Sequence, residues 1–357
     1  MRIIAILLAL WSGCAIAAEL PRARPSPPTK PPAMPTIGGP VDGLGRAGIA
    51  LFNQGKNVFS RVFTPETGLG PLFNNVGCAA CHEVPVVGGS GGFNEDDVDV
   101  ERHATADDRP SCNELTTFGG PVFREQAIPG AKVPSIPGNA GVHIGLRSTP
   151  ALFSSGSIDA VSEETIINNA RRNDGGRAAK LPDGKIGRFG RKATDPDLAG
   201  FVRGAFATEQ GIDAPAEISE TDLLLATFFI ANLAPPDPQV TDQHGSQVFG
   251  NIGCATCHMP SLPTGQGKHA FLYSDLLLHD MGPGLADLCK GAAATNEFRT
   301  EPLMGLRFRS RFLHDGRAER LSAAIAGHGG QGQAAADKFV RLNERDRNAL
   351  MKFLSGL

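Results

Sequence analysis

Two stretches of the chain place apolar residues at the spacing of one helical face. The first covers residues 223–233 and the second residues 347–357. Ser219 stands before the first stretch and Asn343 before the second, and acidic side chains follow each of them, as at the start of a capped helix. We therefore predict a helix in each stretch, and the prolines at 235 and 236 stop the first one.

The two predicted helices close the two halves of an internal repeat. Phe229 aligns with Phe353 and Leu233 with Leu357. Residues 73–77 match residues 249–253, and residues 147–152 match residues 299–303. The first half is the longer one, and we expect its extra residues in Gly-rich loops between 88 and 145 and around 175–190.

The N-terminal 17 residues have the pattern of a secretory signal peptide: a basic start, a short apolar run and Ala-Ile-Ala at 15–17. An alternative is a lipid anchor on Cys14, which small residues precede. Residues 18–40 are predicted to form a Pro-rich linker. Two domains follow at 41–236 and 237–357. No later segment has 18 consecutive apolar residues, so we predict no transmembrane segment in the mature chain.

Composition narrows the function. The formal net charge is -3, which excludes the basic surface of a nucleic-acid-binding protein. The chain has 44 Gly and 27 Pro residues, so we expect long loops between short elements. Its single Trp, Trp11, falls in the predicted signal peptide and is absent from the predicted mature chain.

Four of the seven cysteines form two copies of one motif, C-x-x-C-H. The cysteines are Cys78 and Cys81 in the first copy, followed by His82, and Cys254 and Cys257 in the second, followed by His258. This spacing lets two thiols bond both vinyl groups of one haem c while the adjacent His binds its iron. A four-cysteine zinc site or a redox dithiol is the alternative, and neither explains a His after both pairs.

Two cysteines remain, Cys112 and Cys289. Outside the cytoplasm, leftover cysteines more often pair than stay free, so we predict that these two form a disulfide between the halves.

Further stretches resemble the bacterial di-haem oxidoreductases, a family of peroxidases and thiol oxidoreductases similar to the di-haem cytochrome c peroxidases and to MauG. The matching stretches are residues 77–92, 187–190, 273–284, 298–306, 314–317 and 327–330, and the most specific is Leu-His-Asp-Met-Gly-Pro-Gly at 278–284. The resemblance implies a mainly α fold of two cytochrome c-like domains with long Gly- and Pro-rich loops, and two covalently bound haem c groups.

The resemblance also implies different surroundings for the two irons. One haem relays electrons with both axial positions filled, and His328 is the nearest candidate to join His258 there. Met281, Met304 and His279 are alternatives.

The other haem meets peroxide and needs an acid–base group, for which Glu125 is the candidate, with Gln126 beside it. His103 and His143 are possible distal ligands, although the acid-rich stretch 95–109 is predicted to be a solvated loop. Relatives often have Trp where Arg191 stands, and Tyr273 is the easily oxidised aromatic residue left in the predicted mature chain. Either Tyr273 bridges the haems, or electrons pass directly, or the two haems do not share a high-valent state.

Paired charges supply further candidates. Arg147 and Arg299 could hold haem propionates, and the His279–Asp280 and His314–Asp315 pairs could hold propionates or orient a ring.

Together these observations predict a periplasmic di-haem c-type oxidoreductase of peroxidase type. Its expected partners are peroxide and a small redox protein, a cytochrome c or a cupredoxin, that donates electrons. The alternatives are a di-haem electron carrier without enzymatic activity and a MauG-like oxidase acting on thiols or on a partner protein.

Overall fold

The computed structural model describes residues 37–94, 97–98, 100–108, 111–138, 141–172, 175–212, 217–237 and 242–357. The predicted signal peptide, Cys14 and linker residues 18–36 lie outside the described residues. No helix in these ranges has the length and apolar character needed to cross a membrane.

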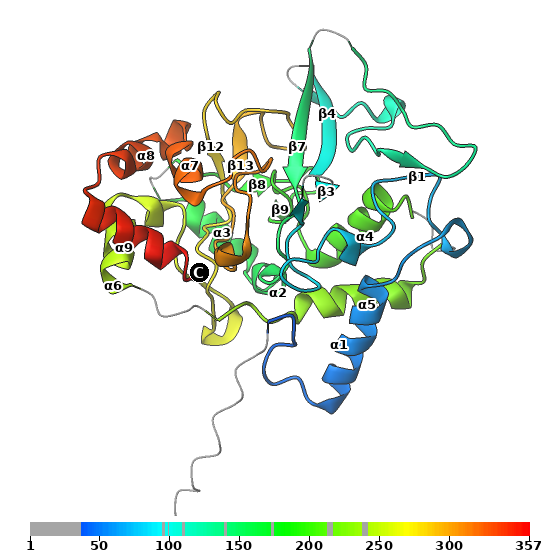
Figure 1. The fold of residues 1–357 in the computed structure, drawn as a ribbon, viewed down its shortest axis with the longest axis horizontal. Coiled ribbons are helices and arrows are strands. Elements are labelled where there is room, and N and C mark those ends of the chain that lie inside the picture. The colour runs from blue at the N-terminus through cyan, green and yellow to red at the C-terminus, as the bar shows by residue number, and fades with distance from the viewer. Residues whose placement is uncertain are drawn as a thin grey trace, which may run out of the picture. The chain divides into compact units, whose positions relative to one another are not determined.

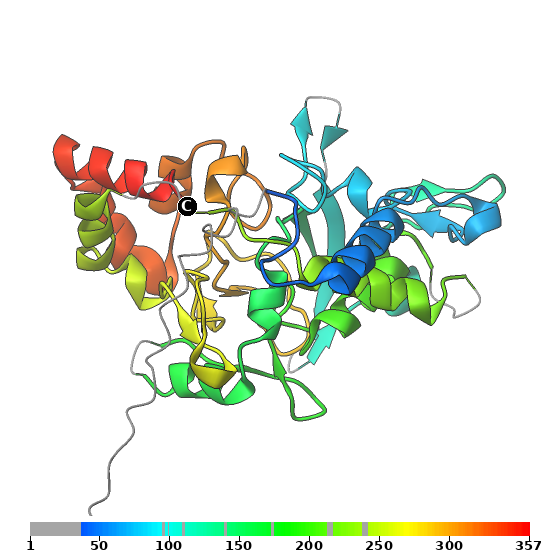
Figure 2. The same cartoon turned by 90° about the horizontal axis from the view of Figure 1, so that it is seen from below.

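Two helix pairs repeat along the chain. Helix α1 (Arg46–Phe59) packs on α5 (Glu220–Ala231), and α6 (Gln243–Asn251) packs on α9 (Glu344–Leu354) in the same manner (Figures 1 and 2). The predicted helices at 223–233 and 347–357 are therefore confirmed as α5 and α9.

Helices α5 and α9 both begin at the predicted capping residue. The Ser219 side chain accepts a hydrogen bond from the backbone N–H of Asp222, and the Asn343 side chain accepts one from Asp346. Each cap satisfies a backbone donor that the first helical turn leaves unpaired.

A glycine lets each helix pair approach closely. A Cβ atom at Gly55 would lie 2.1 Å from the carbonyl oxygen of Leu225, and one at Gly245 would lie 2.1 Å from that of Ala349. Four residues later in each helix, a Phe ring packs on the aligned Phe of the partner: Phe59 on Phe229 at 5.1 Å and Phe249 on Phe353 at 5.4 Å between centroids.

We expect Gly245→Ala to lower the free energy of unfolding by about 1–3 kcal/mol, because the helices must move apart to admit the methyl group. Gly250→Ala in the same helix is the control, since nothing lies within 4 Å of a Cβ there. It should raise stability by up to about 1 kcal/mol through helix propensity. Urea denaturation of both variants tests this, and equal midpoints would contradict the close helix crossing.

The helix pairing corrects one detail of the sequence repeat. The sequence match placed Phe73 opposite Phe249, but the residue that packs like Phe249 is Phe59 in α1. Phe73 lies in the short strand β1 (Leu72–Phe73). An insertion between α1 and the first C-x-x-C-H motif separates the two positions.

The mainly α prediction is wrong, because the fold is mixed α/β. The described residues contain nine α-helices and six small β-sheets. The largest sheet has three antiparallel strands in the order β5 (Ser111–Asn113), β4 (Val100–Asp108) and β7 (Val142–Ser148). Much of the extra length of the first half, expected in loops, forms this sheet.

The remaining elements are short. The other helices are α2 (Ser155–Asp159), α3 (Glu163–Ala170), α4 (Leu198–Glu209), α7 (Leu321–Ala326) and α8 (Gln333–Val340). The other antiparallel strand pairs are β1 with β6 (Gln126–Ala127), β2 (Phe93–Asn94) with β3 (Asp97–Val98), β8 (Ala179–Lys180) with β9 (Ile186–Gly187), β10 (Leu262–Pro263) with β11 (His269–Ala270), and β12 (Leu278–Asp280) with β13 (Glu297–Arg299).

Two hydrophobic cores correspond roughly to the two halves. The larger surrounds Phe59 and Phe229 and extends into the second half as far as Leu277. The smaller surrounds Phe249 and Phe353. The boundary at 236–237 stays a prediction.

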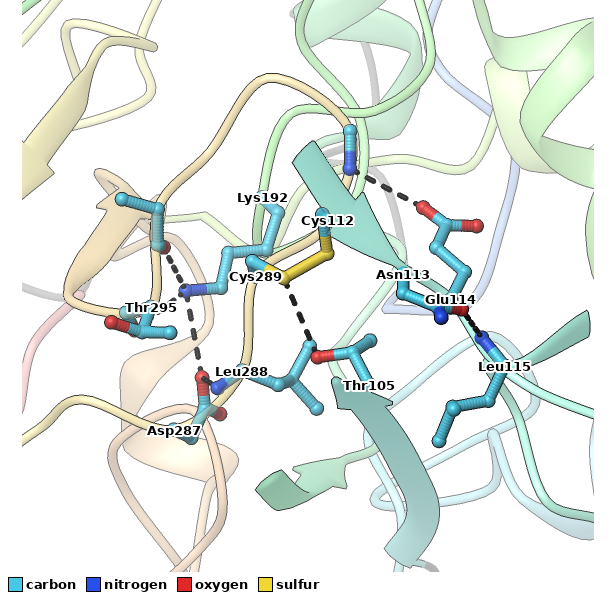
Figure 3. Close-up of a disulfide and its surroundings, with 12 residues drawn as sticks. Thr105, Cys112, Asn113, Glu114, Leu115, Lys192, Asp287, Leu288, Cys289 and Thr295 are labelled. Atoms are coloured by element: carbon cyan, nitrogen blue, oxygen red, sulfur yellow. Dashed lines mark hydrogen bonds and ion pairs between the residues drawn. A yellow bond between two sulfur atoms is a disulfide. The ribbon is translucent and has the colours of Figure 1, made fainter. Parts of the chain in front are cut away.

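The predicted disulfide between Cys112 and Cys289 is confirmed (Figure 3). It joins β5 of the first half to a loop of the second. A buried charge cluster lies beside it, in which the Asp287 carboxylate pairs with Arg147 and with Lys192, whose Nζ is 3.5 Å from Oδ1. Lys192 Nζ also donates to three backbone carbonyls. Both halves therefore contribute to this interface.

Candidate functional site

The first C-x-x-C-H motif folds into a single tight turn. A 3₁₀ helix, η2, covers Cys78–Ala80, and the backbone N–H of His82 donates to the carbonyl of Cys78. Cys78 and Cys81 are half-buried and are not joined to each other by a disulfide. The Nδ1 atom of His82 lies 3.0 Å from the carbonyl oxygen of Pro150 and 3.1 Å from that of Gly89.

The second motif repeats this arrangement. The 3₁₀ helix η4 covers Cys254–Thr256, and the backbone N–H of His258 donates to the carbonyl of Cys254. Cys254 and Cys257 are again half-buried and without a disulfide. The Nδ1 atom of His258 lies 2.9 Å from the carbonyl oxygen of Tyr273.

These contacts prepare both imidazoles to bind a metal. A carbonyl oxygen only accepts, so Nδ1 carries the proton and Nε2 keeps a free lone pair. Burial lowers the pKa of His82 and that of His258 to about 4, so both rings are neutral at pH 7. A neutral ring held through its other nitrogen is the usual form of an iron or zinc ligand.

His328 has the same preparation. Its Nδ1 lies 2.8 Å from the carbonyl oxygen of Ala324, and burial lowers its pKa. Its positive charge, were it protonated, would depress the pKa of His258, so the two rings lie near each other. The Gly-rich segment after it packs against Met281 and Gly282: a Cβ at Gly329 would lie 2.7 Å from the Met281 carbonyl oxygen.

The alternatives to His328 have other surroundings. Met304 is buried, and Met281 lies beside the His328 segment. His279 is buried, and its Nε2 lies 2.9 Å from Asp275 Oδ2. Its carboxylate partner is thus Asp275 rather than the adjacent Asp280 that the sequence suggested.

The surroundings of His279 fix its charge. Desolvation acts most strongly and lowers its pKa, but the hydrogen bonds and charges of Asp275 and Cys257 together raise it to about 10. His279 Nδ1 lies 2.8 Å from Gln331 Oε1 and 3.7 Å from Cys257 Sγ. Both ring nitrogens of His279 therefore have partners, and one donor atom each of Cys257, Asp275 and His279 lie within 4.8 Å of one another.

A pair of carboxylates lies near the first motif. Burial, and then repulsion from Glu101, raise the pKa of Glu209 to about 7, and burial also raises the pKa of Glu101. Glu101 Oε2 lies 2.8 Å from His103 Nε2, and Glu209 accepts from Asn74 at 2.7 Å. The charge of Glu209 acts on Cys78, which places the pair beside the motif.

The Glu101 side chain is partly accessible. It is 32% exposed, and desolvation is the largest influence on its pKa. Burial lowers the pKa of His103 to about 3, so this ring is neutral. Its Nδ1 has no hydrogen-bond partner among the described residues. The prediction that residues 95–109 form a solvated loop is wrong for Val100–Asp108. These residues form strand β4, in which His103 is buried.

Glu125 and Gln126, predicted to serve the first haem, are more exposed than this pair. The Glu125 side chain is 50% exposed and lies 3.2 Å from Arg102. The Gln126 side chain donates to the Asn74 carbonyl. His143 is half-buried in β7, opposite Thr105.

The charged candidates separate into two groups. Arg147 pairs with Asp287 in the interface between the halves, and His314 Nε2 lies 3.2 Å from the same carboxylate. Arg299 instead lies 3.0 Å from Glu301. The sequence analysis missed Glu101, Glu209, Asp275, Glu301 and Arg309, because none of them belongs to a motif that marks its role.

Comparison with known proteins adds a family. A family model described as "Di-haem oxidoreductase, putative peroxidase" matches residues 170–357. No curated protein matches the chain.

Several solved structures are similar to this chain. The diheme peroxidase BthA from Burkholderia thailandensis is 14% identical, with 85% of each chain covered and a TM-score of 0.46. Hydrazine synthase from Kuenenia stuttgartiensis is 13% identical, with 95% of this chain and 100% of that chain covered and a TM-score of 0.45. A MauG-like protein associated with microbial copper homeostasis is 17% identical, with 58% of this chain and 85% of that chain covered and a TM-score of 0.34.

Proposed function

Because the chain belongs to the di-haem oxidoreductase family, we propose that it is a c-type di-haem peroxidase that reduces hydrogen peroxide with electrons from a small redox protein. The observation that carries the proposal is the repeated preparation of His82 and His258, each with Nδ1 on a backbone carbonyl and Nε2 free. When bound, the two haems supply an iron that meets peroxide and an iron that passes electrons to it.

The donors of both motifs fit haem c. Four half-buried thiols stand in two pairs, each followed by a neutral imidazole. Cys78 and Cys81 would form thioethers to one haem, and Cys254 and Cys257 to the other. Thioethers carry no charge, which suits Cys78 and Cys254: burial raises the pKa of their thiols to about 12 and about 11.

Intact mass tests attachment. The exported chain should carry two haems, and the Cys78→Ala/Cys81→Ala variant should carry one. The control is Cys112→Ala/Cys289→Ala, which should keep both because these residues belong to the disulfide. Colourless wild-type protein whose mass shows no haem would overturn the proposed function.

We place His328 opposite His258 at the second haem, where two imidazoles would close the iron. A closed iron suits electron relay, and bis-His ligation lowers the reduction potential relative to His/Met. On this basis the second haem receives electrons from a cytochrome c or a cupredoxin.

We expect His328→Ala to convert the second haem from low spin to high spin, as read by electron paramagnetic resonance. His269→Ala, at an exposed position, should leave the spectrum unchanged. If His328→Ala keeps the low-spin signal, His328 is not the second ligand of that haem, and Met281 or Met304 becomes the candidate.

At the first haem we place proton transfer on Glu101 and Glu209. Burial, and then repulsion from Glu101, raise the pKa of Glu209 to about 7, so Glu209 can gain and lose a proton near neutral pH. The ionised member can take the proton from one peroxide oxygen, and the pair can return it to the oxygen that leaves as water. Glu125, predicted from the sequence, is the competing candidate.

Rapid mixing with hydrogen peroxide separates this function from its alternatives. A peroxidase changes the absorption of one haem within the mixing experiment, whereas an electron carrier with both irons closed leaves it unchanged. A change in haem absorption that is reversed by a thiol or a partner protein, and not by a reduced cytochrome, would favour the MauG-like oxidase. The predicted signal peptide supports a periplasmic location, with a lipid anchor on Cys14 as the alternative.

A further inference from the structure

Three arginines, one from the first half of the chain and two from the second, lie close to Glu301 of the second half. Glu301 Oε2 lies 2.8 Å from Arg191 Nη1 and 3.0 Å from Arg299 Nη2, and Glu301 Oε1 lies 3.8 Å from Arg309 Nη1. We call these four residues the arginine cluster. The arginine side chains are only 10%, 7% and 10% exposed, in the order Arg191, Arg299 and Arg309.

The cluster has more positive than negative charge. Three guanidinium groups face the carboxylate of Glu301, and Arg191 also interacts with the carboxylate of Glu101 outside the cluster. The nearest further carboxylate acting on Arg299 is that of Asp275, which is already bonded to His279. Arginine stays protonated in proteins, and a buried unpaired charge costs several kcal/mol.

Arg309 is the member whose side chain makes no hydrogen bond among the described residues. Arg191 also donates to the Ser148 carbonyl, and Arg299 to the Gly190 and Thr300 carbonyls. Within the described residues, the guanidinium of Arg309 makes no hydrogen bond, and its one ion pair spans 3.8 Å. Burial, and then repulsion from Arg191, lower the pKa of Arg309 to about 10.

Solvent reaches the carboxylate of the cluster. The Glu301 side chain is 25% exposed, whereas the three arginine side chains around it are only 7% to 10% exposed.

Short chains of contacts also link the cluster to both haem motifs. On one side, Arg191 donates to the carbonyl of Ser148, two residues before Pro150, whose carbonyl holds His82. Two residues span at most about 7 Å.

On the other side, Glu301 follows Thr300, whose carbonyl accepts from the Ser274 hydroxyl at 2.6 Å. Ser274 follows Tyr273, whose carbonyl holds His258. These contacts connect the arginine cluster with Pro150 and Tyr273, whose carbonyls hold the two proximal imidazoles.

Resting on the proposed function, we propose that the arginine cluster is the receptor for a propionate group of a bound haem. A propionate is a carboxylate, the group that guanidinium forks bind best, and a haem held at His82 or His258 brings its own propionates to this region. The propionate balances part of the surplus charge and supplies the missing hydrogen bonds of Arg309. Free carboxylate or sulfate from solution shares this chemistry and is the competing occupant.

Redox titration of the haem-loaded protein tests the assignment. In Arg309→Gln, one haem loses a nearby positive charge that favours its reduced state, so its midpoint potential should become more negative. The freed propionate should also titrate, which makes that potential depend on pH between about 5 and 8, where propionate in a less positive site ionises. Arg309→Lys keeps the positive charge, so its midpoint potential should stay close to that of the wild type.

Arg311→Gln is the matched control. It removes the same charge two residues away, but Arg311 is 32% exposed and pairs with Glu319 at 2.6 Å, so the potentials should change less and stay independent of pH. Equal shifts in both variants, or none in Arg309→Gln, would overturn the propionate assignment.

Added anions decide between the two occupants. A propionate already fills the site, so sulfate should cause no saturable change in the wild-type potentials beyond that of potassium chloride at equal ionic strength. A saturable response to sulfate would overturn the propionate assignment. Haem content by mass is measured on every sample, so loss of haem counts against the proposed function, and normal haem content with unchanged potentials counts against this inference alone.

Discussion

The Glu101→Gln/Glu209→Gln variant is expected to lose about 10²–10⁴-fold in kcat/KM for hydrogen peroxide. An amide can neither take the proton from one peroxide oxygen nor return it to the other. The electron-relaying half should be untouched, so the second haem should still be reduced by the donor at the wild-type rate. Steady-state turnover together with that reduction rate checks both statements.

The raised pKa of Glu209 sets the direction in which activity should change with pH. The folded pKa of Glu209 is raised to about 7 from 4.5, so the carboxylate pair becomes able to accept a proton only as the pH rises through about 7. Activity should therefore fall below pH 7 and reach a plateau above it, and the double variant should lack this limb. Glu125→Gln is the comparison: if it loses the limb and the double variant keeps it, the proton-handling role belongs to Glu125.

The Cys112→Ser/Cys289→Ser variant is expected to be less stable by about 2–5 kcal/mol. The bridge spans 177 residues of sequence, and closing so long a loop restricts the unfolded chain strongly. Urea denaturation should give a lower midpoint.

Reduction of the wild-type protein provides the control for this variant. The reduced wild type should unfold at the midpoint of the variant, and the reductant should not change the variant itself. A variant as stable as the oxidised wild type would show that the buried Asp287 cluster holds the halves together without the bridge.

Helices and haem motifs could be predicted because their signals are local. A cap such as Ser219, the acidic turn after it and the apolar spacing lie within one short segment, and so do the cysteines and histidine of each motif. Sequence order alone places these groups together.

The sheet could not be predicted in the same way. Strand β4 buries His103, Ala104 and Thr105 in a row, without the alternation of apolar and polar residues that indicates a strand. Pairing with β7 stabilises it instead, and that pairing is visible only in the fold.

The site shows the same division. His328 could be named as a candidate because the family resemblance implies a second ligand downstream of the His-Asp-Gly motif at 314–316, and His328 is the nearest candidate there. Glu209, at the end of α4, gains its raised pKa from burial and then from Glu101, which lies on a strand far away in sequence. Arg309 gains its significance only when Arg191 and Glu301 lie beside it.

The position of the disulfide sets an order for biogenesis. Cys112 is synthesised 177 residues before Cys289, and Cys78 and Cys81 are already present when it emerges. Until Cys289 arrives, the nearest available thiols are the wrong ones. Early attachment of haem to Cys78 and Cys81 would prevent these thiols from pairing with Cys112. Premature oxidation would instead block both haem attachment and formation of the Cys112–Cys289 disulfide. Yield of correctly matured protein should therefore depend on the balance between haem supply and oxidising catalysts during export.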